Sequence, residues 1–155
     1  MARVGFYHLQ RMGLELALPK LLEKALAAHQ RVVVKAASPE RVADLDDRLW
    51  TTTDESWLPH GSKRDGNAAL QPVWLTDGDD NPNNATILVL CDGADCGQAV
   101  AFERILDLFD GNDAEAVAAA RNRWRRLKEG GHELVYYQQT AEGGWVEKAR
   151  DGGGG

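Results

Sequence analysis

Residues 31–49 read RVVVKAASPERVADLDDRL, and they decide the fold class. The first five are three consecutive valines between Arg31 and Lys35. Such an uninterrupted β-branched run suits a central strand covered on both faces of a sheet. Ser38 then precedes Pro39, an order typical of a helix N-cap followed by proline at the first helical position. The helix is expected to run to about Leu49 and to bury its apolar side. The stretch is therefore one strand followed by one helix.

The preceding residues repeat this order. Residues 3–7 are a short apolar run with strand character, and residues 13–30 carry leucines and alanines at helical spacing. Pro19 is compatible with a helix only in its first turn, so regular helix is predicted to begin near Leu18. Two successive β-then-α units predict a mostly parallel sheet between helical layers.

The rest of the chain continues the alternation. The patterns predict strands at residues 72–75, 86–91, 104–109 and 133–139, a helix from Asp113 to about Glu129, and a terminal strand or core cover at Trp145 and Val146. We predict an α/β fold: a three-layer α/β/α sandwich with a central, mostly parallel sheet. One domain is expected over residues 1–150, followed by a flexible glycine-rich tail at residues 151–155.

Composition restricts the class of protein. The chain is 43% hydrophobic and 27% charged, which is typical of a globular domain. No apolar run approaches the roughly 18 residues of a membrane span, and the N-terminus lacks a signal-peptide pattern, so a cytoplasmic protein without membrane contact is predicted. The net charge of −6 argues against a molecule drawn as a whole to DNA.

The two cysteines, Cys91 and Cys96, are too few for a disulfide framework, and their spacing is poor support for zinc. Reduced, inert thiols are expected in a reducing compartment. We predict no metal site and no cofactor.

No catalytic motif is found. The four histidines, His8, His29, His60 and His132, are scattered, and neither Gly-x-Ser-x-Gly nor His-Glu-x-x-His occurs. His60 is expected to make a hydrogen bond that organises its loop. The alternative of a nucleotide-dependent α/β enzyme would need a phosphate-binding glycine loop, and none is present. An enzyme is therefore not predicted.

A basic segment stands out in this acidic chain. Residues 121–128 carry five positive charges and no negative one. Helical spacing predicts an apolar face with Arg121, Arg125 and Lys128 as a stripe beside it; the face consists of Val117, Ala120, Trp124 and Leu127. Guanidinium groups next to an apolar ledge suit a short peptide that carries a hydrophobic residue and carboxylates.

Two other interpretations of this segment remain open. Basic residues near a helix C-terminus are favoured by the helix dipole, so the stripe is also typical of a solvated face with Trp124 half in the core. A direct single-stranded DNA-binding module would use arginine and a stacking tryptophan, although the acidic net charge opposes a large contribution.

Residues 49–61 hold two of the five tryptophans, Trp50 and Trp57, in a segment too broken for one regular element. Pro59 restricts the preceding residue to an extended conformation. Large aromatic side chains in a loop either fill the protein's own core or contact a partner. Trp50 can pin the loop to the core, and Trp57 with Leu58 can form an apolar docking patch.

An ordered set of residues resembles the chi subunit of bacterial DNA polymerase III over residues 1–148. The set comprises Phe6-Tyr7, Leu45-Asp46, Leu49-Trp50, Ser56-Trp57-Leu58-Pro59-His60, Pro72-Val73, Arg121, Trp124 and Arg125. The resemblance implies an α/β fold and a non-catalytic accessory subunit associated with the clamp loader. It also implies a bridge to single-stranded DNA-binding protein, made by capturing the acidic, phenylalanine-ending C-terminal tail of that protein.

The resemblance further assigns residues and partners. Arg121, Trp124 and Arg125 would bind the tail, and the helical stripe adds Lys128. Trp50, Trp57 and Leu58 match the region that faces the psi subunit or a repair helicase, and DNA would be reached only through these partners.

The chain departs from a related chi subunit at Val117, where that subunit carries lysine. Val117 belongs to the predicted tail site, and the missing charge is expected to weaken the tail contact or shift it toward Arg125.

Overall fold

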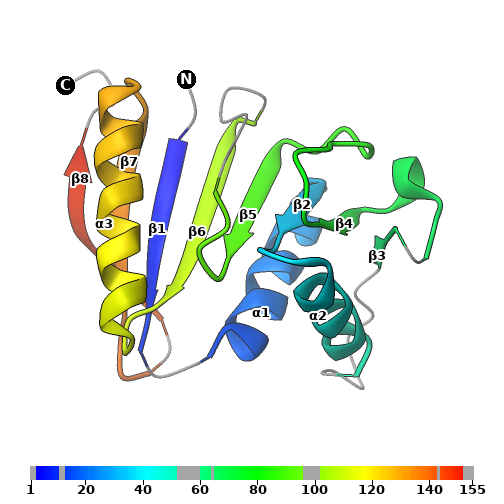
Figure 1. Cartoon of the computed structure of the whole chain (residues 1–155), viewed down its shortest axis with the longest axis horizontal. Coiled ribbons are helices and arrows are strands. Elements are labelled where there is room, and N and C mark those ends of the chain that lie inside the picture. The colour runs from blue at the N-terminus through cyan, green and yellow to red at the C-terminus, as the bar shows by residue number, and fades with distance from the viewer. Residues whose placement is uncertain are drawn as a thin grey trace.

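The structure is a computed structural model that describes residues 3–10, 13–51, 60–63, 65–95, 102–142 and 144–151, with the backbone alone for residues 50 and 51. Within these residues one eight-stranded sheet has the order β3-β4-β2-β5-β6-β1-β7-β8 (Figure 1). The elements in chain order are β1 (Arg3–Leu9), α1 (Leu14–Ala27), β2 (Val32–Lys35), α2 (Pro39–Thr51), β3 (Gly61–Ser62), the 3₁₀ helix η1 (Ala68–Leu70), β4 (Val73–Thr76), β5 (Ile87–Cys91), β6 (Arg104–Asp110), α3 (Ala114–Glu129), β7 (Glu133–Gln139) and β8 (Trp145–Asp151).

The sheet is mostly parallel, as predicted. Strands β1 to β7 pair in parallel, and only β8 runs antiparallel, against β7. β1 lies between β6 and β7, so that Phe6 is aligned with Asp107 on one side and with Tyr136 on the other. Three segments that are distant in sequence therefore form one surface.

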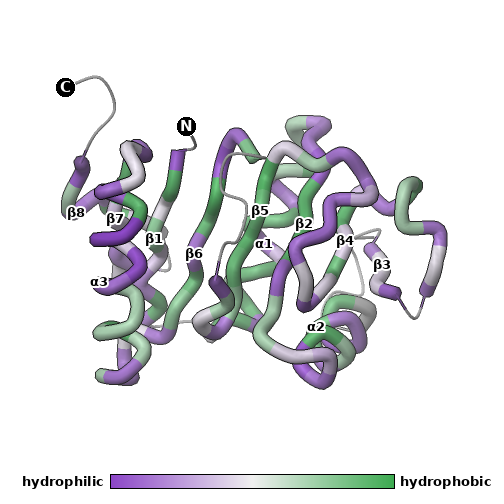
Figure 2. The backbone as a smooth tube through the Cα atoms, turned by 45° about the horizontal axis from the view of Figure 1, so that its top comes forward, coloured by the Kyte–Doolittle hydropathy of each residue, from purple (hydrophilic) through white to green (hydrophobic). Residues whose placement is uncertain are grey.

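Helices cover both faces of the sheet, which confirms the α/β class and the layered arrangement. α1 and α2 pack on one face through residues such as Leu18, Leu22 and Leu45. α3 packs on the other face through Ala120, with Trp124 half-buried against the same core cluster. Figure 1 shows α3 in front of β7 and beside β1, and in Figure 2 hydrophobic residues concentrate on the inner strands while the C-terminal part of α3 is hydrophilic.

The predicted start of the first helix was wrong. α1 begins at Leu14, where the carbonyl oxygen of Gly13 accepts hydrogen bonds from the amides of Leu16 and Ala17 at 3.1 and 3.0 Å. Pro19 therefore lies inside the helix and removes one backbone donor. Its ring is buried, so apolar burial offsets part of that loss.

α2 follows the prediction. The hydroxyl of Ser38 accepts a hydrogen bond from the amide of Arg41 at 3.2 Å, and Pro39 is the first helical residue. Leu45 and Leu49 are buried. The side chain of Trp50 lies outside the described residues, as do Trp57 and Leu58.

A buried polar cluster joins α2 to β3. Ser62 is buried and donates a hydrogen bond from its hydroxyl to the carboxylate of Asp46, which is itself buried, at 3.0 Å. His60 is buried beside it, with its Nε2 atom 3.1 Å from the carbonyl oxygen of Asp46. His60 therefore makes the predicted hydrogen bond, and residues 52–59 of the loop before it lie outside the described residues.

Cys91 is buried at the end of β5, and burial raises the pKa of its thiol far above the ordinary range. A protonated, inaccessible thiol is unreactive. In the part of the chain that the structure describes, no His, Cys, Asp and Glu side chains gather into a potential metal site. None of the helices found there is long and apolar enough to cross a membrane.

A candidate binding groove between α3 and β8

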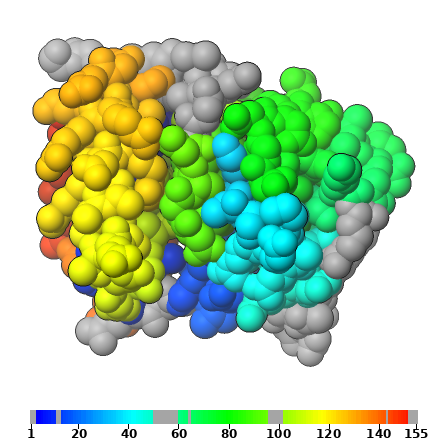
Figure 3. Space-filling view, in the orientation of Figure 1, coloured from blue at the N-terminus to red at the C-terminus, as the bar shows by residue number. Residues whose placement is uncertain are grey.

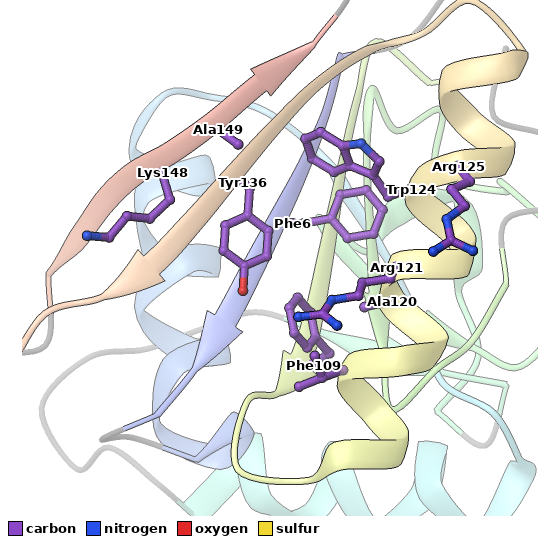
Figure 4. A pocket seen from close by; sticks show the side chains of 10 residues that line it. Phe6, Phe109, Ala120, Arg121, Trp124, Arg125, Tyr136, Lys148 and Ala149 are labelled. Atoms are coloured by element: carbon purple, nitrogen blue, oxygen red, sulfur yellow. The ribbon is translucent and has the colours of Figure 1, made fainter.

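A groove of about 510 Å³ lies between α3 and the β7–β8 pair, on the face of the sheet that α3 covers. Its lining comprises Phe6, Phe109, Val117, Ala120, Arg121, Trp124, Arg125, Tyr136, Lys148 and Ala149 (Figure 4). One wall is helical, the other is the edge of the sheet, and aromatic rings form the floor. In Figure 3 the outer side of α3 is open to view along its length.

The aromatic floor is a connected set of rings. The Phe6 and Trp124 centroids are 5.4 Å apart with an interplanar angle of 60°, an edge-to-face arrangement. Tyr136 lies 6.5 Å from Trp124 and 6.2 Å from Phe109. Ring pairs of this kind favour a fixed geometry, so the floor is preorganised for an apolar group.

Two contacts fix the position of α3 and determine which of its side chains face the sheet. Asp113 caps its N-terminus by accepting a hydrogen bond from the amide of Glu115 at 3.0 Å, as predicted. Near the middle of the helix, Arg123 donates to both carboxylate oxygens of Asp107 on β6, at 2.6 and 3.0 Å. Both side chains of this ion pair are buried. Because Arg123 points into the sheet, Trp124 is directed toward the groove and Arg121 and Arg125 toward its rim.

Three of the five basic residues in the 121–128 segment make ion pairs within the described part of the chain, and two do not. Arg123 is buried on Asp107, Arg126 pairs with both oxygens of Asp95 at the surface, and Lys128 pairs with Asp151 of β8 at 2.8 Å. Arg121 and Arg125 make no ion pair with any residue that the structure describes, and the same holds for Lys148 on β8. All three of these residues line the groove.

Tyr136 forms the side of the groove next to β8. Its hydroxyl is hydrogen-bonded to Nδ1 of His8 on β1. Burial raises the pKa of Tyr136, and the charge of Arg121 offsets this only partly. The phenol therefore stays neutral near pH 7, and the charge of the groove is entirely positive.

A second hollow lies at the carboxyl ends of β1 and β6, where α/β folds often bind ligands. Its one cation, Arg41, contacts Glu15, Asp44 and Asp92 at 3.1, 2.6 and 2.5 Å. These pairs leave no unpaired positive charge in this hollow for a phosphate.

Comparison with known proteins decides the family. Residues 1–135 match the family described as DNA polymerase III chi subunit, HolC. The chain belongs to this family. A probable DNA polymerase III subunit chi of Rickettsia prowazekii is 29% identical over 109 residues, which are 70% of this chain and 66% of that protein. The DNA polymerase III subunit chi of Pseudomonas aeruginosa is 28% identical over 137 residues, 86% of this chain and 94% of that protein. A chi subunit is an accessory replication subunit and a part of the polymerase complex.

The chi-family fold brings most of the predicted tail-binding residues together. Val117, Arg121, Trp124 and Arg125 all line the groove. Lys128 does not, because its ammonium is directed to Asp151. The predicted docking residues, Trp50, Trp57 and Leu58, cannot be placed, since their side chains lie outside the described residues.

Five lining residues were not predicted from the sequence: Phe6, Phe109, Tyr136, Lys148 and Ala149. Each lies on a strand, and alternation within a strand shows only which residues share a face. Placing the three rings together requires the strand order β6-β1-β7, which no local pattern contains.

Proposed function

We propose that this chain is a non-catalytic accessory subunit that links the clamp-loader complex to single-stranded DNA-binding protein. It does so by holding the acidic C-terminal tail of that protein in the groove between α3 and β8. The observation that carries the proposal is the match between an aromatic floor and three unpaired cations on one side, and a phenylalanine next to carboxylates on the other.

The binding geometry follows from the lining. The terminal phenylalanine would lie on the half-buried rings of Trp124 and Tyr136, which Phe6 supports from the core beneath. The carboxylates would meet Arg121 and Arg125, whose planar guanidinium groups bind carboxylate with two parallel hydrogen bonds. The groove is open, so these pairs are partly screened by water and salt.

The first test is titration of a synthetic peptide with the sequence of the host's tail, followed by calorimetry or tryptophan fluorescence. Wild type is expected to bind in the micromolar range, and Arg121→Ala should weaken binding roughly tenfold at low salt, since a charge-assisted hydrogen bond contributes about 1.5–3 kcal/mol before screening. Trp124 lies in the groove and gives an intrinsic signal.

Arg126→Ala is the matched control for Arg121→Ala. It removes the same side chain from the same helix, but Arg126 already pairs with Asp95 outside the groove. Its effect on peptide affinity should stay below about twofold. Equal losses in both variants, or no binding by a folded wild type, would refute the tail site. Oligonucleotide binding that falls steeply with salt would then favour direct DNA binding.

We further propose that Trp50, Trp57 and Leu58 dock a psi subunit or a repair helicase, as the family resemblance implies. Buried tryptophans commonly dominate the energy of such interfaces. Trp57→Ala should weaken partner capture at least tenfold and leave tail-peptide affinity unchanged, as measured in pull-down and titration experiments on one preparation. Parallel loss of both activities would contradict two independent sites.

A further inference from the structure

The β8 wall of the groove contains a β-bulge. Tyr137 pairs with Glu147 and Tyr136 pairs with Ala149, so one step along β7 spans two steps along β8. Lys148 is the extra residue and has no partner across the ladder. A bulge changes the direction of the side chains around it, because it interrupts the alternation of faces.

Contacts on both faces of the sheet hold this bulge in place. Arg150 pairs with Glu147 at 2.6 Å, although residues three apart on a regular strand lie on opposite faces. Arg150 also pairs with Glu133 of β7 at 3.1 Å. On the other face, Asp151 pairs with Lys128 of α3. Ion pairs on both faces of the sheet therefore fix the pairing of β8 with β7 before and after Lys148.

The consequence is that two adjacent residues of β8, Lys148 and Ala149, both line the groove. A regular strand would present only one of them to α3. Ala149 is small and leaves the floor open next to Tyr136, while Lys148 adds a cation on the β8 side of the groove, with its side chain directed away from α3 in Figure 4. In Figure 4 Arg121 and Lys148 lie on opposite sides of Tyr136.

We propose that Lys148 is a specificity-determining residue that pairs with a carboxylate of the bound acidic peptide on the β8 side. The peptide is then held between cations of two separate elements, with Arg121 and Arg125 on α3 and Lys148 on β8. This inference rests on the proposed tail-binding function. It concerns a wall that lies beyond the family match, which ends at residue 135, before β8 begins.

Cations on both walls of the groove favour ligands whose carboxylates are spaced widely enough to reach both walls. A peptide with a single terminal carboxylate can satisfy α3 alone, whereas a peptide with further acidic side chains reaches both walls. Lys148 is exposed and has a long, flexible stem, so its ammonium adjusts to the carboxylate that it meets. The contribution is therefore expected to depend strongly on salt.

The test is a double-mutant cycle between Lys148→Ala and tail peptides in which aspartates are replaced by asparagine. Lys148→Ala should weaken binding of the acidic peptide roughly three- to tenfold at low salt, and the loss should fall below about twofold for the peptide whose aspartates are neutralised. Lys24→Ala, on α1 across the sheet, removes the same charge as a control and should leave affinity unchanged. Thermal unfolding checks that each variant is folded.

The outcomes separate the two proposals. No binding of the acidic peptide by folded wild type overturns the tail-binding function itself. Binding that Arg121→Ala weakens and Lys148→Ala leaves unchanged overturns only the role of Lys148. An equal loss for acidic and neutralised peptides also overturns it, because a merely structural role of Lys148 would not depend on the ligand's charge.

Discussion

Asp107→Ala is expected to lower the free energy of unfolding by about 3–5 kcal/mol, because it leaves the charge of Arg123 buried without a partner. Both side chains lie between α3 and the sheet, with 6% and 1% of their surface exposed for Arg123 and Asp107. Urea denaturation followed by circular dichroism measures the loss as a lower midpoint at unchanged slope. The same variant should release α3 and reduce peptide affinity.

Arg126→Ala is the matched comparison. Arg126, on the same helix as Arg123, also donates two hydrogen bonds to one carboxylate, that of Asp95, at 3.0 and 3.2 Å. These two side chains are 59% and 61% exposed. Its cost should be about 0–1 kcal/mol. If the two substitutions destabilised the protein equally, burial would not be what makes the Arg123–Asp107 pair important.

The buried pair is expected to fix the position of α3 more than to add stability. Burial raises the pKa of Asp107, and the neighbouring guanidinium offsets this only partly. Taking two charges out of water costs free energy that their mutual attraction in a buried pair commonly does not recover in full. The double variant Asp107→Leu with Arg123→Met should regain most of the stability that Asp107→Ala loses. A double variant as unstable as Asp107→Ala would indicate that the ion pair itself stabilises the fold.

Local sequence patterns identified the regular elements well, because each depends on neighbouring residues. The valine run of β2 and the Ser38–Pro39 start of α2 are formed where predicted. Pro19 shows the limit: its position inside α1 depends on packing of the whole helix against the sheet, which outweighs the local preference. Ser62 is buried for a similar reason, since its partner Asp46 lies on a different element.

The groove was predicted only on its helical side. Spacing along one helix correctly grouped Arg121, Trp124 and Arg125. It also added Lys128, because spacing shows a shared face but not which residue a charge will pair with. Lys148 takes that place in the lining from another element, and only the pairing of β8 with β7 and its bulge bring it there. Charge stripes on a helix therefore identify one wall of a site, and strand order determines the other.

Gly111→Ala is expected to disturb the groove indirectly, because Gly111 lies in the turn between β6 and α3. The amide of Gly111 donates a 2.7 Å hydrogen bond to the carbonyl oxygen of Leu9, so the two backbones approach closely. An added Cβ would lie 2.8 Å from that oxygen and 1.7 Å from the ring of His8. The backbone must shift and His8 must move, at a cost of about 1–3 kcal/mol or more.

The effect should reach the groove through His8, which is hydrogen-bonded to the hydroxyl of Tyr136. Displacing His8 removes that contact and frees the Tyr136 ring, so a lower urea midpoint and weaker tail-peptide binding are expected together. Gly130→Ala is the control: Gly130 has helical φ, and its added Cβ would meet its nearest neighbour, the ring of His132, at 3.3 Å, which needs a shift of only a few tenths of an ångström. That variant should stay within about 0.5 kcal/mol of wild type. Wild-type peptide affinity in a destabilised Gly111→Ala protein would mean that Tyr136 holds its place through Trp124 and Phe109 alone, and the support from β1 would then contribute nothing to binding.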